Sequence, residues 1–158
     1  YDLFTPLQLA NYIATLVGGG QHYEAHLLKN VKSYDNSSVI YAYDKAPLNT
    51  VEMSDSTVQA VKEGMHNLTT GSLSYYFSNC VVSAGAKTGT AETGIANTNN
   101  GVFVCFAPYD DPQIAVAVVI EKGGSGAALA STAVDIVNSY FSQEEIGAVV
   151  IGENTLLK

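Results

Sequence analysis

Lys87 is a candidate for chemistry because it lies among small residues and hydroxyls, in the stretch AKTGT that follows Val81 and Val82. A lysine is costly to hold in or near a core, so its place here needs a reason. One reason is structural: the chain of methylene groups lies along a strand and the amine reaches water. A second is a Schiff-base lysine, which the sequence leaves open but which gains nothing from neighbouring hydroxyls.

Two more specific motifs contain a lysine in such surroundings. A phosphate-binding loop needs a glycine directly before the lysine and another glycine five residues before that one. This chain has Ala86 and Val81 at those positions, which excludes the loop. The other motif is the Lys-Thr-Gly of active-site serine enzymes that act on D-alanyl peptides and β-lactams. In that motif the lysine charge and the threonine hydroxyls hold a substrate carboxylate, and the glycine leaves room for the ligand.

Length and composition limit the classes of protein to consider. The chain has 158 residues, which suits one domain, and its 47% hydrophobic and 14% charged residues indicate a packed body. A net charge of −8 argues against nucleic acid as a partner, because phosphate binding needs a basic surface. Cys80 and Cys105 belong to no CxxC or Cys/His cluster, so we predict no metal and no cofactor. The chain begins with Tyr1 and not with Met, and we interpret it as a piece of a longer protein.

The first half of the chain shows helix and turn signals. Thr5, Pro6 and Gln8 form a capping box with proline in the first turn, which predicts a helix that the glycines at 18–20 end. Residues 26–43 predict a β-hairpin around the turn at 35–37, and residues 49–53 are expected to be extended. Ser54 predicts the cap of a second helix that ends at residues 69–71.

The last third of the chain predicts three strands and a covering helix. The strands are expected at 81–91, 102–107 and 114–120, and the helix at 127–141, which together make an α+β fold. A turn centred near residues 96 and 97 would place Cys105 opposite Thr88, far along the strand from Cys80. A disulfide needs Cα atoms within about 7 Å, so we predict two free thiols.

Four segments together resemble a known family. AGAKTGTAETG and the following NNGVFVCFAPYDDPQIAVAVVIEKGG resemble the motif strand and the next two strands of the penicillin-binding protein transpeptidase domain. TPLQLANYIATLVGGG resembles a helix upstream of that strand in class B members, and VKEGMHNLTTGS resembles the segment between them. The resemblance runs in order from about residue 5 to residue 142. It implies part of the serine β-lactamase-like fold: an antiparallel sheet of three strands covered by a C-terminal helix, with further helices and a β-hairpin.

The resemblance also assigns roles to the residues of the motif. It implies that Lys87 and Thr90 are catalytic, with the backbone N–H of Thr90 forming half of an oxyanion hole. It implies that Thr88, Gly89 and Thr90 bind the substrate. The family also needs a serine nucleophile in Ser-x-x-Lys and a Ser-x-Asn motif. No serine of this chain has lysine three residues on or asparagine two residues on.

We therefore expect residues 1–142 to be the C-terminal part of a transpeptidase domain whose nucleophile-bearing half is absent, and residues 143–158 to be a tail. The resemblance implies a parent D,D-transpeptidase, a serine-type enzyme that cross-links peptidoglycan, membrane-anchored at the extracytoplasmic face of the bacterial membrane. The implied partners are a stem peptide ending in D-Ala-D-Ala, β-lactam antibiotics and the absent half of the domain. The chain alone should be inactive. The alternatives are a D,D-carboxypeptidase or serine β-lactamase, and a non-catalytic β-lactam-sensing or scaffold module.

Overall fold

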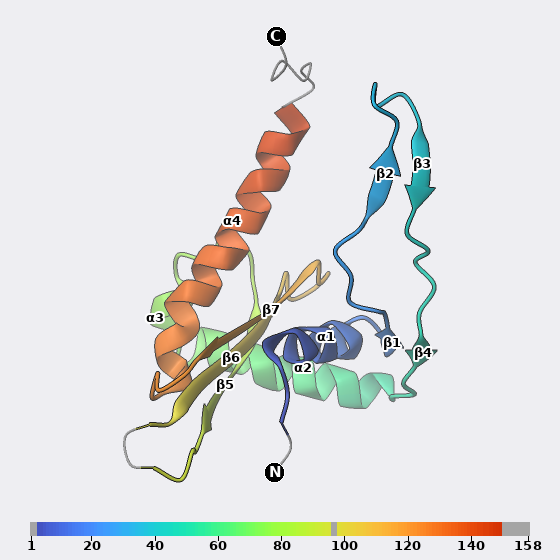
Figure 1. The fold of residues 1–158 in the computed structure, drawn as a ribbon. Helices are drawn as coiled ribbons and strands as arrows, with labels where there is room; N and C mark the ends of the chain where they lie inside the picture. Colours follow the sequence, from blue (N-terminus) through green and yellow to red (C-terminus); the bar gives the residue numbers. More distant parts are fainter. Residues whose placement is uncertain (1–2, 96–97, 150–158) are drawn as a thin grey trace.

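The computed structural model describes residues 3–95 and 98–149, and it shows an α+β fold built in three layers (Figure 1). A three-stranded sheet forms the middle layer. Helix α4 (Ala130–Val149) covers one face of the sheet, and helices α1 (Pro6–Val17) and α2 (Asp55–Thr70) lie against the other face. The fold class expected from the sequence is confirmed.

The sheet consists of β5 (Gly85–Ala91), β6 (Asn100–Ala107) and β7 (Ile114–Ile120), antiparallel and in that order. The register of β5 and β6 differs from the predicted one by two residues, because Cys105 faces Ala86 and Thr88 faces Phe103. A shift of two residues keeps each side chain on its predicted face of the sheet. Residues 96 and 97, where we predicted the turn, lie outside the described residues. Strand β5 also begins at Gly85 and not at residue 81.

The face under α4 carries the larger hydrophobic core. Phe103 and Cys105 of β6 are fully buried against Ala133 and Val137 of α4, and Phe103 stacks on Phe77 with ring centroids 6.5 Å apart. A 3₁₀ turn, η1 (Gly126–Leu129), leads into α4. The helix continues to Val149, beyond residue 141 where the sequence predicted its end.

The opposite face buries a smaller core under α1 and α2. Ile13 and Leu16 of α1 and Met65 of α2 pack on Phe106 of β6. Both helices begin as predicted: the Thr5 hydroxyl accepts the backbone N–H of Gln8, in a complete capping box. Ser54 likewise caps α2 by accepting the N–H of Thr57, at 3.2 Å.

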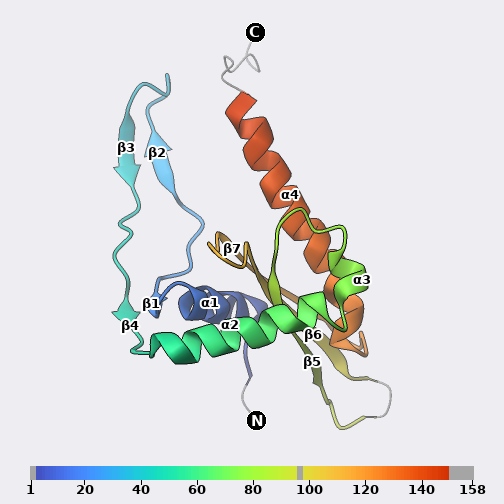
Figure 2. The same ribbon diagram turned by 180° about the vertical axis from the view of Figure 1, so that it is seen from behind.

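The predicted hairpin is present and stands away from the three layers in both views (Figure 1, Figure 2). Its strands are β2 (Asn30–Lys32) and β3 (Val39–Ala42), paired antiparallel with a bulge after Val31. At its base, β1 (Gln21–His22) pairs with β4 (Asn49–Thr50) beside α1. A short helix, α3 (Ser74–Phe77), follows α2 in the chain.

Both cysteines are free, as predicted. Burial raises the pKa of the Cys105 thiol to about 12, with a smaller contribution from Cys80, so this thiol stays protonated at neutral pH. In the observed register Cys105 lies opposite Ala86 and not Thr88. No helix within residues 3–95 and 98–149 is both long and apolar enough to cross a membrane.

Candidate functional site

The predicted site residues lie together on β5, which forms one edge of the sheet. Lys87 and Thr90 are exposed, and Thr88 and Gly89 are half-buried. Thr88 and Thr90 share one face of the strand, and Lys87 and Gly89 share the other, because side chains alternate along a strand. The structure thus brings the four residues onto one open strand edge.

The open edge of β5 carries the polar backbone groups of the even-numbered residues. A Cβ at Gly126 would lie 2.2 Å from the Val102 carbonyl oxygen, 2.3 Å from that of Gly89 and 2.9 Å from the Gly89 nitrogen. The backbone groups of Gly89 therefore face its partner Val102, and the odd positions of β5 turn toward β6. Alternate residues of a strand point their N–H and C=O groups to opposite sides. In agreement, the carbonyl oxygen of Thr88 accepts a hydrogen bond from the Lys87 ammonium nitrogen at 2.8 Å, at an exposed position. The N–H of Thr90 belongs to the same open edge.

Gly89 of β5 and Gly126 of η1 differ in whether the surrounding packing requires a glycine. A Cβ added at Gly89 would lie 3.4 Å from the nearest atom, the Cβ of Val102, which is an ordinary contact. The packing of this chain therefore does not itself require glycine at position 89. A Cβ at Gly126 would lie 2.2 Å from the carbonyl oxygen of Val102 and 2.3 Å from that of Gly89, which no side chain tolerates. Gly126 thus allows η1 to pack directly on the backbone of β5 and β6.

The segment that leads into β5 is held by side chains that sequence reasoning did not identify. Asn138 of α4 accepts the N–H of Val81 at 2.9 Å and donates to the carbonyl of Asn79 at 2.9 Å. From α2, Thr69 and His66 both reach the carbonyl of Ala84. A local sequence pattern cannot predict these bonds, because they join residues between 15 and 59 positions apart in the chain.

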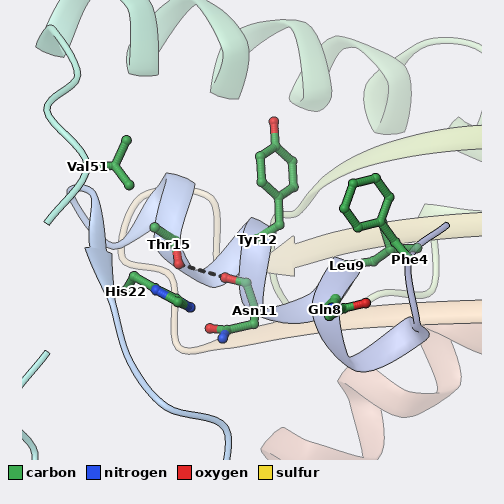
Figure 3. Close-up of a pocket in the computed structure, with 8 residues that line it drawn as sticks. All are labelled: Phe4, Gln8, Leu9, Asn11, Tyr12, Thr15, His22 and Val51. Atoms are coloured by element: carbon green, nitrogen blue, oxygen red, sulfur yellow. Dashed lines mark hydrogen bonds between the residues drawn. The ribbon is translucent and has the colours of Figure 1, made fainter. Parts of the chain in front are cut away.

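A cavity of about 460 Å³ lies elsewhere, between α1 and the paired strands β1 and β4 (Figure 3). The residues that line it are Phe4, Gln8, Leu9, Asn11, Tyr12, Thr15, His22 and Val51. The hydroxyl of Thr15 donates its proton to the carbonyl of Asn11 at 2.8 Å, so toward a ligand it could act only as an acceptor. No residue of β5 lines this cavity, so the charge of Lys87 and the cavity are separate features.

The comparison with protein families identifies this architecture. A family model described as the penicillin binding protein transpeptidase domain matches residues 2–140. Because the match covers most of the 158 residues, the chain belongs to the penicillin-binding protein transpeptidase family. The class B family expected from the sequence is thereby confirmed.

Individual relatives agree with the family assignment. Penicillin-binding protein 2A of Bacillus subtilis is 30% identical over 173 residues, covering 100% of this chain and 23% of that protein. The peptidoglycan D,D-transpeptidase MrdA of Escherichia coli K12 is 27% identical over 146 residues, covering 82% of this chain and 23% of the relative. The structure of penicillin-binding protein 2B from Streptococcus pneumoniae R6 superposes with a TM-score of 0.77 at 30% identity, over 89% of this chain and 25% of that one. This chain therefore spans about a quarter of the length of its relatives.

The geometry defines what β5 can do chemically. It offers an ammonium group, two hydroxyls and an outward N–H on one strand edge, with glycine between the threonines. Such a set can hold a carboxylate and stabilise an oxyanion, and it contains no serine nucleophile.

Proposed function

We propose that this chain is the C-terminal part of the transpeptidase domain of a peptidoglycan D,D-transpeptidase, and that it forms the Lys-Thr-Gly wall of the active site. The observation that carries the proposal is the placement of Lys87, Thr88, Gly89 and Thr90 on an open strand edge, in a chain of this family. We further propose that the parent protein is membrane-anchored and works at the extracytoplasmic face of the bacterial membrane, where peptidoglycan is assembled.

In the proposed reaction, a serine from another part of the protein attacks the carbonyl carbon of the bond between two D-alanines. The developing oxyanion accepts the outward N–H of Thr90, and the C–N bond then breaks as the departing amine takes a proton. The acyl group next passes to an amine of a neighbouring strand, which restores the serine. β-Lactams react at the same serine by opening their ring, and so stay attached as acyl groups.

The residues of β5 bind and orient the substrate in this scheme. The ammonium of Lys87 attracts the terminal carboxylate, and the hydroxyls of Thr88 and Thr90 donate hydrogen bonds to it. Gly89 leaves the strand surface open, which fits the absence of any packing requirement for glycine there. Since a bound carboxylate is a better acceptor than the Thr88 carbonyl, Lys87 is expected to leave that carbonyl when substrate binds.

The test is Lys87→Met in the full-length protein, with Lys32→Met on the hairpin as the matched control. Hydrogen bonds to charged groups contribute roughly 1.5–3 kcal/mol, so penicillin acylation should slow by about tens- to hundred-fold. The melting temperature should not change, because Lys87 is exposed. Acylation rates and thermal unfolding are measured for both variants. An acylation rate equal to that of wild type in Lys87→Met would refute the assignment of β5 to the active site.

A second test concerns the chain on its own. Its serines lie in no Ser-x-x-Lys motif, so we expect no covalent labelling of residues 1–158 by a fluorescent penicillin. Labelling is measured by gel fluorescence and intact mass, with the full-length protein as the positive control. A stoichiometric adduct on a serine of this chain would contradict the expected inactivity. A full-length protein that also fails to react would favour a non-catalytic module.

A further inference from the structure

The carbonyl of Ala84, immediately before β5, accepts hydrogen bonds from two side chains of α2. The Thr69 hydroxyl lies 2.7 Å from this oxygen, and Nδ1 of His66 lies 2.9 Å from it. Ala84 is buried and precedes the first residue of the β5–β6 ladder, so α2 supplies these two donors to its carbonyl. Because a carbonyl has two lone pairs, the two side chains complete its hydrogen bonding.

Burial distinguishes this contact from an ordinary surface bond. Thr69 is 3% exposed and is the one polar residue in the buried class among those whose side chains the structure describes. Its hydroxyl also lies 2.8 Å from the carbonyl of His66, so a single proton is shared between the backbone of α2 and Ala84. A buried carbonyl left without a donor is costly, and the pair therefore fixes where the chain enters β5.

The ring of His66 is held in place by the ring of Tyr109. It stacks on Tyr109 with ring centroids 4.4 Å apart, and the Tyr109 hydroxyl accepts a bond from Gln59 of α2 at 3.1 Å. The N–H of Tyr109 donates to the carbonyl of Ser83, the residue before Ala84. Helix α2 and the turn between β6 and β7 thus both bond consecutive residues of the segment that enters β5, Ala84 and Ser83 respectively.

Gly85, the residue after Ala84 and the first of β5, packs closely against α2 and β6. A Cβ on Gly85 would lie 2.5 Å from the ring of Phe106 and 3.2 Å from the Cβ of Met65, so the strand lies directly on α2. At about 3.3 Å per residue, Lys87 follows Ala84 by roughly 10 Å and Thr90 by roughly 20 Å. A small change of direction at Ala84 therefore displaces both groups.

We propose that Thr69 and His66 are positioning residues that set the place of β5, and with it the place of Lys87 and the N–H of Thr90. The consequence for acylation rests on the proposed function, whereas the placement of the strand does not. Misplacement by about 1 Å can cost on the order of a hundredfold in rate, so the two side chains affect the reaction without touching the substrate.

The experiment compares variants of the full-length protein that lose or keep the donors. Thr69→Val and His66→Phe keep shape and remove the bonds to Ala84, alone and combined. Thr69→Ser keeps the hydroxyl, and His66→Asn keeps an N–H while losing the ring. Thr70→Val is the matched control, since the Thr70 hydroxyl bonds the His66 carbonyl at 3.0 Å but does not reach Ala84.

The first measurement is backbone hydrogen exchange of β5, which needs no enzymatic activity. We expect the amides of Gly85, Lys87, Gly89 and Ala91, which point toward β6, to exchange at least about tenfold faster in the combined Thr69→Val and His66→Phe variant, with Ile114–Ile120 as the internal reference. Thr69→Ser, His66→Asn and Thr70→Val should stay within about twofold of wild type. Unchanged exchange in the combined variant would overturn the proposal.

The second measurement is the time course of acylation by a fluorescent penicillin. The amplitude reports the folded fraction, and the rate constant reports the geometry of β5. We expect the rate constant of the combined variant to fall by tenfold or more at unchanged amplitude, as a misplaced site predicts. A loss of amplitude alone would overturn the positioning role and leave a structural one. If wild type does not react while exchange responds as expected, the proposed function fails and the placement of β5 by Thr69 and His66 stands.

Discussion

Strand β5 and the hairpin of β2 and β3 both have an open edge, but they differ in how the rest of the molecule holds them. Side chains of α2 and α4 and the turn after β6 bond the segment that enters β5. The hairpin strands pack on each other and make no extensive contact with another helix or strand of the described residues. A two-stranded hairpin is marginal in water, whereas an edge strand seated on a sheet is not.

The difference is also visible in where apolar side chains lie. On β6, the neighbour of β5, Phe103 and Phe106 are 0% exposed, whereas Ile40 of the hairpin is 69% exposed. The exposed apolar residues of the hairpin region are Leu27, Leu28, Val31, Tyr34, Val39, Ile40 and Tyr41. Hydrophobic sequence alone therefore does not produce a core: a strand becomes a firm support only where helices cover it.

The largest contrast between the two regions should come from truncating one aromatic ring in each. Phe103→Ala in the full-length protein should lower the free energy of unfolding by about 3–5 kcal/mol, because it empties the core under α4. Tyr34→Ala on the hairpin, where the side chain is 96% exposed, should change it by less than about 0.5 kcal/mol. Urea unfolding measures both. Equal losses would show that the hairpin is packed in the full-length protein.

Replacing each of two glycines by alanine should give a smaller difference in the free energy of unfolding. Gly126→Ala should lower the free energy of unfolding by about 1–3 kcal/mol, since its Cβ would meet two backbone carbonyls at β5 and β6. Gly64→Ala on the exposed face of α2 has nothing within 4 Å of its Cβ and should stabilise the protein by about 0.5–1 kcal/mol. Thermal unfolding of the two variants measures the difference. A harmless Gly126→Ala would mean that η1 does not pack on β5 as described.

The smallest effect concerns the tip of the hairpin and depends on pH. Hydrogen bonds from the side chains of Ser33 and Ser37, then from the Ser37 N–H, lower the pKa of Asp35 from 3.8 to about 2. A lowered folded-state pKa means that the order of the tip is fully present above pH 3.8 and is lost as the pH falls through about 2. Titration of Asp35 by NMR should show this midpoint, and Ser33→Ala should move it back toward 3.8. A midpoint at 3.8 in wild type would show that the tip is unstructured in solution.

The parts of the fold that sequence reasoning predicted are those set by local interactions. The caps of α1 and α2 fall on Thr5 and Ser54, because a cap is decided by a side chain and an N–H a few residues away. The three strands of the last third followed from their apolar runs and the turns between them, and the structure has them in that order. The predicted pairing of β5 with β6 differs from the observed one by two residues. The pairing depends on the length and path of the connection between the strands, which the residue types in it do not reveal.

The supports of the candidate site could not be predicted in the same way. His66 and Thr69 belong to no recognisable sequence motif for a site, and the residue whose carbonyl they bond, Ala84, is a common small residue. Gly126 belongs to an apparent linker, GGSG, where glycine needs no further explanation until the structure shows two carbonyls against it. Such positions are defined by contacts between distant segments, which a single sequence does not display.

The bonds that Asn138 makes to the backbone of Asn79 and Val81 have a consequence for synthesis on the ribosome. Because the chain is made from its N-terminus, residues 79–81 leave the ribosome 57 or more residues before their partner does. During that interval the segment that enters β5 lacks its bonds to α4. The strand that carries Lys87 therefore gains its support from α4 only after Asn138 has been translated, and a nascent chain that stops before Asn138 lacks that support.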